Sequence, residues 1–358
     1  RQELFRYLLM LLAALATTVV IATTYSRISR HRSRSIAKQL EKMGQYDLVE
    51  KLGEGGMGTV YRATHALLKR PTAIKLLRSD VVGERGALER FEREVKITSG
   101  LESAHTISIY DFGRTKSGVF YYAMELLEGM SLEDLVEQYG AQPPARVAHF
   151  LLQACESLAE AHDHGLIHRD IKPDNMFLCQ RAFFGDFIKV LDFGLVKEIE
   201  ADSKVTQAGN LVGSPAYIAP ETAQHPDTID HRVDIYALGA VGYFLLTGSL
   251  LFDKTSVMDM LVAHAVEIPR PCSELAPNVP PALEKIISRC LEKERDDRFA
   301  TARELATALE EGGLLSGWSK AHATRWWQDT FHPVHRDPEA SLELSSSVDI
   351  AVAQNLGT

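Results

Sequence analysis

Two short motifs, close together in the sequence, constrain the fold of this chain more than any other feature. The first is the octet His168-Arg169-Asp170-Ile171-Lys172-Pro173-Asp174-Asn175, and the second is the triplet Asp192-Phe193-Gly194. An Asp, a Lys, an Asn and a second Asp at these spacings can together hold a hydroxyl group, a phosphate and two metal ions. The chain must therefore fold so that both motifs meet, and the chemistry that they predict is transfer of a γ-phosphoryl group to an alcohol.

The composition is typical of a globular protein, and the charge distribution argues against one class of binding partner. The 358 residues suggest two or three domains, and 24% of them are charged and 45% hydrophobic. The net charge is −9, and outside one short segment no basic stripe carries interleaved aromatic residues, so we expect no nucleic-acid partner. The cysteines form no CxxC pair, which indicates reduced thiols. They are Cys155, Cys179, Cys272 and Cys290.

Residues 7–25 form an uncharged, apolar stretch near the start of the chain. As a helix it would be roughly 28 Å long, close to the hydrocarbon thickness of a bilayer. A signal-peptide apolar region is usually shorter, and a buried core helix is rarely apolar on all sides over such a length. The sequence therefore predicts one transmembrane helix at residues 7–25.

Charges beside the predicted span indicate its orientation. Residues 26–45 carry a basic cluster, whereas residues 1–6 hold two arginines and a glutamate. Because cytoplasmic flanks are enriched in Lys and Arg, we expect a single-pass protein of the cell membrane with its larger C-terminal part in the cytoplasm. Residues 26–45 would be a basic juxtamembrane linker. The first residue is Arg1 and not Met, so residues 1–6 are expected to be a short flank of a longer protein.

From residue 46 onward the pattern divides into a β-rich part and a helical part. Residues 46–128 contain alternating β-branched and aromatic runs, typical of an antiparallel sheet, with one helix at about residues 84–100. Residues 129–311 are mainly helical, and we expect a cleft between the two parts. Apolar residues recur at helical spacing in four segments. These segments are 145–164, 233–246, 280–291 and 301–310.

Residues 312–358 are poor in apolar periodicity. Trp318, Trp326 and Trp327 suggest a segment that docks on the surface of the domain, whereas the Asp-, Pro- and Ser-rich run after them is typical of disorder. We therefore expect a tryptophan-containing, largely disordered tail outside the folded domain.

Further motifs lie around the octet and the triplet in a fixed order. They are Gly53-Glu54-Gly55-Gly56-Met57-Gly58-Thr59-Val60, Ala73-Ile74-Lys75, Met124-Glu125-Leu126-Leu127 and Ala219-Pro220-Glu221. With these motifs, residues 46–311 resemble the eukaryotic-like (Hanks-type) protein Ser/Thr kinases, and among them the bacterial membrane-anchored members. The resemblance implies an α+β, bilobal protein kinase fold, with a small β-rich N-lobe (46–128) and a larger α-helical C-lobe (129–311), preceded by the transmembrane helix.

The resemblance implies a site for ATP in the N-lobe. The Gly-rich loop would let the backbone approach the phosphates, and Met124 would guard the back of the adenine pocket. Glu125 and Leu127 would bind adenine through backbone groups, so we expect their side chains to matter little. The implied ATP-binding residues are Gly53, Gly55, Gly58, Val60, Ala73, Lys75, Glu125, Leu127 and Phe177.

The resemblance also implies the catalytic and metal-binding groups. Asp170 would be the base that accepts or orients the proton of the substrate hydroxyl, and Lys172 would reach the γ-phosphate. Asn175 and Asp192 would hold Mg²⁺, with Mn²⁺ as an alternative. Lys172 in this loop favours Ser or Thr over Tyr as the acceptor.

On the N-lobe side, Lys75 would hold the α- and β-phosphates and pair with Glu94, a contact that makes the enzyme switchable. Glu89 and Glu92 are competing candidates for this pairing. Relatives usually have His-Pro-Asn after this helix, whereas this chain has Ser103-Ala104-His105. We therefore expect regulation to transfer from the family less well than chemistry.

Residues 192–221 would be the activation segment. Thr206 is the candidate for an activating phosphate, with an unmodified loop threonine as the alternative, and Arg169 would pair with that phosphate. Ser214 occupies the substrate-facing position.

Two further contacts are expected to be structural. Glu221 should meet Arg298, and Asp234 should bond the backbone around His168 and Arg169. Both contacts would fix segments of the active site to the helical lobe.

Three hypotheses for function follow. The first is a membrane-anchored Ser/Thr protein kinase whose partners are protein substrates and which forms a homodimer for autophosphorylation in trans. The second is a pseudokinase or ATP-binding scaffold, which loss of Lys75, Asp170, Asn175 or Asp192 would have favoured, and all four are present. The third is a small-molecule phosphotransferase, which usually lacks both the Gly-rich motif and the Ala-Pro-Glu ending.

Overall fold

The structure is a computed structural model of the chain. It describes residues 45–55, 58–77, 87–115, 119–181, 184–193, 215–225 and 228–331. No helix within these ranges is long and apolar enough to span a membrane. The predicted span at residues 7–25 and all but the last residue of the linker at residues 26–45 lie outside them.

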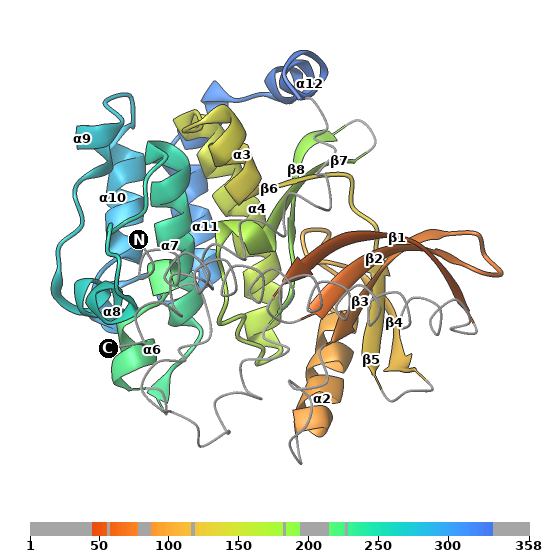
Figure 1. Cartoon of the computed structure of the whole chain (residues 1–358). Helices are drawn as coiled ribbons and strands as arrows, with labels where there is room; N and C mark the ends of the chain where they lie inside the picture. Colours follow the sequence, from red (N-terminus) through yellow and green to blue (C-terminus); the bar gives the residue numbers. More distant parts are fainter. Residues whose placement is uncertain are drawn as a thin grey trace, which may run out of the picture.

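The N-lobe is a five-stranded antiparallel sheet with the order β1-β2-β3-β5-β4, and helix α2 lies beside it (Figure 1). Apolar side chains of neighbouring strands, among them Ala63, Ile74 and Ala123, form its core. This architecture agrees with the alternating runs in the sequence. The elements are β1 (Tyr46–Gly55), β2 (Gly58–His65), β3 (Pro71–Leu77), α2 (Ala87–Ser99), β4 (Ile109–Arg114) and β5 (Phe120–Glu125).

The C-lobe is built around α7 (Arg232–Thr247), whose side chains are buried without interruption from Val233 to Leu246. An added Cβ at Gly239 would lie 2.5 Å from the Cβ of Cys290, so glycine permits the close contact with α10. The four helices predicted from periodicity are present with each end shifted by one residue. They are α4 (Pro144–Asp163), α7, α10 (Pro281–Cys290) and α11 (Ala302–Glu311).

Shorter helices complete the C-lobe (Figure 1). They are α3 (Leu132–Tyr139), η2 (Pro215–Tyr217), α6 (Pro220–Gln224), α8 (Val257–Val266), α9 (Cys272–Leu275) and η4 (Arg295–Asp297). All four cysteines are free and buried within the C-lobe, which agrees with the expected reduced thiols.

A second, three-stranded sheet lies at the start of the C-lobe, where the sequence analysis expected mainly helices. Its strands are β6 (Gly129–Ser131), β7 (Met176–Arg181) and β8 (Phe184–Val190), and helix η1 (Pro173–Asn175) leads into β7. Strands β7 and β8 are antiparallel, with Met176 opposite Val190. The octet ends directly before β7, and the triplet is separated from the end of β8 by one residue, so this pairing brings the two motifs together.

The boundary expected after residue 311 needs correction. Helices η5 (Leu314–Gly317) and α12 (Lys320–Asp329) continue the packed C-lobe, η5 against α4 and α12 against β8. The indole N–H groups of Trp318 and Trp327 donate to the carboxylate of Asp186 on β8 at 2.8 and 3.0 Å. Residues 314–331 are thus docked, as the tryptophans suggested, whereas residues 332–358 lie outside the described residues.

Candidate active site

Strand pairing places the predicted nucleotide-binding side chains of the N-lobe on one face of the sheet. Val60 on β2 lies opposite Lys75 on β3, and Lys75 lies opposite Tyr122 on β5. Ala73, two residues before Lys75, lies opposite Met124. Residues that are directly opposed, or two apart on one strand, share a face of a sheet, so these five side chains point the same way.

The described glycines of the Gly-rich loop are of two kinds. Gly58 has a φ of +157°, and an added Cβ would lie 2.0 Å from the carbonyl oxygen of Leu76, so only glycine allows this approach of β2 to β3. At Gly53 and Gly55 an added Cβ would meet no atom within 4 Å. Packing against protein does not explain these two glycines, and their lack of a side chain keeps the space beside the loop open.

Two donors from the N-lobe sheet hold the carboxylate of Asp192. The Nζ atom of Lys75 lies 2.6 Å from Oδ2, and the Tyr122 hydroxyl donates to Oδ1 at 2.7 Å. Burial by itself would raise the pKa of Asp192, but the positive charge of Lys75 and these hydrogen bonds outweigh it, so the pKa lies below its ordinary value. Burial and the charge of Asp192 raise the pKa of Tyr122 well above its ordinary value, so the hydroxyl stays a donor.

Within the octet, Asn175 fixes Asp170. Its Nδ2 donates to the backbone carbonyl of Asp170 at 2.8 Å and to the carboxylate oxygen Oδ2 at 2.9 Å. The Nζ atom of Lys172 lies 3.8 Å from the same oxygen. Because the amide nitrogen of Asn175 faces Asp170, the amide oxygen is left to face any other ligand.

His168 connects the octet to the triplet. Its Nδ1 accepts a hydrogen bond from the backbone N–H of Asp170 at 3.2 Å, and its Nε2 donates to the carbonyl of Leu191 at 2.8 Å. These partners require the neutral ring with hydrogen on Nε2, and burial lowers the pKa of His168, which favours that form. Phe193 is fully buried and packs on the imidazole, with ring centroids 4.7 Å apart. The two motifs are therefore one packed unit.

Asp234, in the first turn of α7, holds the backbone of the octet, as expected from the sequence. Its carboxylate accepts the N–H groups of His168 and Arg169, both at 2.8 Å, and lies 2.9 Å from Nε2 of His162. Arg169 has a φ of +61°, a conformation that costs energy for a residue with a side chain, and these bonds offset that cost. Burial would raise the pKa of Asp234, but the hydrogen bond and charge of His162 together with the other donors lower it.

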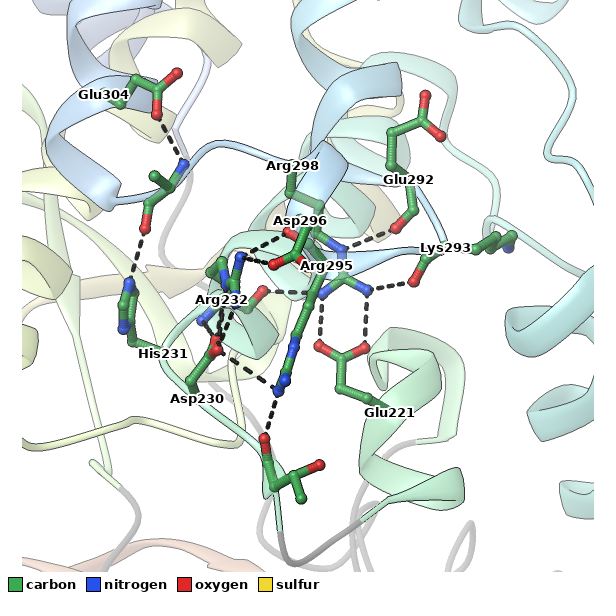
Figure 2. Close-up of polar contacts among 12 residues, drawn as sticks. Glu221, Asp230, His231, Arg232, Glu292, Lys293, Arg295, Asp296, Arg298 and Glu304 are labelled. Atoms are coloured by element: carbon green, nitrogen blue, oxygen red, sulfur yellow. Dashed lines mark hydrogen bonds and ion pairs between the residues drawn. The ribbon is translucent and has the colours of Figure 1, made fainter.

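Arg298 fixes the start of α6, where the predicted activation segment ends. Figure 2 shows its bidentate contact with Glu221, at 2.7 and 2.8 Å. Its other N–H groups donate to the backbone carbonyls of Glu292, Lys293 and Arg232. All five donors of the guanidinium are used, so Arg298 can be buried without an unsatisfied group.

We expected the side chain of Glu125 to matter little, and this expectation needs correction. It is buried, with Oε1 2.5 Å from Nζ of Lys189 and Oε2 3.1 Å from Nη2 of Arg181. The backbone N–H of Ser108 also donates to Oε1 at 2.9 Å. Lys189 lies on β8, so this ion pair joins the end of the N-lobe sheet to the small sheet that carries the two motifs.

The remaining predicted residues are placed as follows. Glu94 is buried on α2, and its pairing with Lys75 stays a prediction. Thr206 and Ser214 lie outside the described residues. Leu127 follows β5 and Phe177 lies on β7, and both are half-buried.

The donor set suits Mg²⁺ that arrives with a nucleotide. Within the described parts of the chain, no group of three or more His, Cys, Asp or Glu side chains could hold a metal ion by itself. Mg²⁺ often binds through one or two protein oxygens and completes its shell with phosphate and water. The ionised carboxylate of Asp192 and the amide oxygen of Asn175 are hard ligands of this kind.

Comparison with known proteins identifies the family. The family model described as protein kinase domain matches residues 46–309, more than half of the chain. The chain belongs to the protein kinase family. The kinase domain of PknI from Mycobacterium tuberculosis superposes with a TM-score of 0.60 at 26% identity, over 75% of this chain and 96% of that chain. The predicted bilobal kinase fold is thereby confirmed.

Several bacterial kinases are similar in sequence to this one. The serine/threonine-protein kinase pkn3 of Myxococcus xanthus is 35% identical over 271 residues, which cover 74% of this chain and 49% of that protein. Pkn1 of the same organism is 38% identical over 269 residues, or 75% and 38% of the two chains. The probable serine/threonine-protein kinase PknB of Corynebacterium glutamicum is 32% identical over 317 residues, or 86% and 48%. The chain spans about half or less of the length of these relatives.

Proposed function

We propose that this chain is a serine/threonine-protein kinase that transfers the γ-phosphoryl group of ATP, with Mg²⁺, to Ser and Thr hydroxyls of protein substrates. One observation carries the proposal: the polar groups that this reaction needs are all present and are linked by direct contacts. Asn175 fixes Asp170, His168 joins Asp170 to the triplet, and Lys75 contacts Asp192. The similar bacterial proteins are named serine/threonine-protein kinases, which supports the choice of acceptor.

In this proposal, two side chains of the octet act on the reacting groups directly. The carboxylate of Asp170, fixed by Asn175, would accept or orient the proton of the attacking hydroxyl. Lys172, with Nζ 3.8 Å from that carboxylate, would face the γ-phosphate and neutralise the charge that develops on it. Position and electrostatics therefore supply most of the catalysis, as expected for phosphoryl transfer.

The nucleotide would lie against the N-lobe face that carries Val60, Ala73 and Lys75. The open space at Gly53 and Gly55 leaves room for phosphates beside the backbone. When bound, Mg²⁺ neutralises phosphate charge, and Asp192 and Asn175 are the residues that would hold it. The backbone N–H of Glu125 donates to Ser108, so its carbonyl is the group left for adenine.

Regulation and cellular place are further parts of the proposal. Arg169 would receive a phosphate on Thr206, added by autophosphorylation, because a guanidinium pairs well with a phosphate dianion. A membrane helix at residues 7–25, with the kinase domain in the cytoplasm, is supported by the apolar stretch and its basic flank. Homodimerisation in the membrane would bring two kinase domains together for reaction in trans.

The test is incubation of the full chain in detergent with labelled ATP, Mg²⁺ and a generic basic protein, beside Asp170→Asn. We expect labelling of the chain and of the basic protein, a loss of at least about 100-fold in the variant, and phosphate on Thr206 by mass spectrometry. Absence of labelling with retained ATP binding would favour the pseudokinase alternative. Equal labelling of both proteins would show that Asp170 is not the base.

A further inference from the structure

Tyr122 contacts the catalytic centre, although the reaction proposed above gives it no role. The residue is 1% exposed, and it lies on β5 directly opposite Lys75 on β3. Opposed residues of antiparallel strands point to the same face, so the sheet aims a phenol and an ammonium at one carboxylate. The Tyr122 hydroxyl donates to Oδ1 of Asp192 at 2.7 Å, and Lys75 Nζ lies 2.6 Å from Oδ2.

The two donors differ in what nucleotide binding would do to them. Lys75 is the residue proposed to hold the α- and β-phosphates, so its contact with Asp192 must be shared with or given to the nucleotide. Tyr122 is not among the residues proposed to bind phosphate, and its strand β5 lies between β3 and β4 in the N-lobe sheet. The hydroxyl of Tyr122 is therefore the donor that stays with Asp192 throughout.

A fixed donor is useful at Asp192 because this residue lies just beyond the end of β8, outside its strand pairing. The residue has a φ of +54°, which few residues with a side chain adopt, and it follows β8 instead of lying in it. A carboxylate oxygen has two acceptor positions, so the bond from Tyr122 occupies one position of Oδ1 and leaves the other, together with Oδ2, for a cation. The phenol is neutral and does not repel that cation.

We propose that Tyr122 is a positioning residue that orients the Asp192 carboxylate for the Mg²⁺ ion that accompanies ATP. The proposal rests on the role of Asp192 as a metal ligand in the proposed function. Groups that orient a metal ligand through a hydrogen bond typically change metal affinity by about 10–100-fold when removed. Removal of the Tyr122 hydroxyl should therefore raise the Mg²⁺ requirement and leave the nucleotide site otherwise intact.

The experiment compares the full chain with Tyr122→Phe, which deletes the hydroxyl oxygen alone. Tyr121→Phe is the matched control, because it makes the same change at the next residue of β5, on the opposite face of the sheet. The dissociation constant of a fluorescent ATP analogue is measured without metal, and Mg²⁺ is then titrated into the complex. We expect Tyr122→Phe to weaken Mg²⁺ binding about tenfold, with unchanged metal-free nucleotide affinity and with kcat recovered at high Mg²⁺. Tyr121→Phe should match the wild type.

Several results would contradict the proposal. Equal Mg²⁺ affinity in wild type and Tyr122→Phe would remove the role of the hydroxyl, and tighter binding in the variant would show that Tyr122 competes with the metal. If Tyr122→Phe lost metal-free nucleotide affinity by the same factor as Mg²⁺ affinity, the cause would be damaged packing. Tyr122→Leu, which also lacks the hydroxyl but has another shape, tests this case by showing whether the loss of Mg²⁺ affinity persists. If the wild type binds no Mg²⁺ with the nucleotide, the proposed function itself fails.

Discussion

At the scale of single residues, the site is organised by buried charges that are each paired. Lys75 contacts Asp192, Arg298 contacts Glu221, and Lys189 contacts Glu125. A charge without a partner is costly to bury, so each pair fixes the distance between two segments that would otherwise be independent. The Lys189–Glu125 pair is the clearest case, because it joins the last residue of β5 to β8.

We therefore predict that Lys189→Met lowers the free energy of unfolding by about 3 kcal/mol, since it leaves Glu125 buried without its closest cation. Urea unfolding followed by circular dichroism measures this change. Lys285→Met removes an exposed lysine from α10 and serves as the control, which should remain within about 0.5 kcal/mol of the wild type. A Lys189 variant as stable as this control would show that the buried pair contributes nothing.

At the scale of elements, residues 314–331, which include η5 and α12, form a segment that we call the brace. Helix α12 packs on β8, the strand that leads to Asp192, and η5 packs on α4. The carboxylate of Asp186 on β8 accepts two bonds from Arg146 of α4, at 2.7 and 2.8 Å, besides those of Trp318 and Trp327. The guanidinium of Arg146 also lies 3.9 Å from the ring centroid of Trp326, a cation–π contact. Arg146, Asp186 and Trp327 are buried, and Trp318 and Trp326 are half-buried, so the brace packs as part of the domain.

The brace gives a prediction with a convenient signal, because the three tryptophans of the chain all lie within it. Urea unfolding followed by tryptophan fluorescence should coincide with unfolding followed by circular dichroism, as one cooperative transition. A chain ended after Glu311 should lose about 3 kcal/mol or more of stability, because two hydrogen bonds to a buried charge disappear, whereas a chain ended after Phe331 should not. Fluorescence that changes at lower urea than circular dichroism would mean that the brace detaches on its own.

At the scale of the whole molecule, the groups proposed to bind ATP and Mg²⁺ come from both lobes. Lys75 belongs to the N-lobe sheet, whereas Asn175 is the last residue of η1 in the C-lobe and Asp192 follows β8. A ligand that contacts both lobes dissociates when either lobe unfolds. Its binding should therefore raise the free energy of unfolding of the two lobes together.

We predict that MgATP at 100 times its dissociation constant raises the free energy of unfolding of the whole chain by about 2.7 kcal/mol, in a single transition. Differential scanning calorimetry with and without EDTA measures this effect, and removal of Mg²⁺ should abolish most of it, because Asp192 is an anion that would repel the phosphates without a metal. Asp170→Asn should still show the stabilisation, since Asp170 is proposed to act on the substrate hydroxyl. Stabilisation of one lobe alone would contradict the shared site.

Much of this molecule could be predicted from its sequence. The strand alternation of residues 46–128 and the helical periodicity of four segments each carry a local signal, because a sheet face and a helix face impose their own repeat. The contacts of Asp234 and of Glu221 with Arg298 were also expected, since the octet, the Ala-Pro-Glu ending and these residues stand in the order of the family. The sequence therefore predicted which functional side chains are present and which helix, strand or loop carries each of them.

Other features depend on pairing between distant segments, which no local pattern encodes. The short strands β7 and β8, the role of Glu125 with Lys189, the docking of residues 314–331 and the contact of Tyr122 with Asp192 all follow from register and packing. The sequence by itself determined which side chains are available for the proposed chemistry, because a hydroxyl acceptor, phosphates and a metal need particular side chains. The tertiary structure decided which of those side chains meet and which further residues orient them, because a hydrogen bond or a buried ion pair forms only where folding brings both partners within about 3 Å.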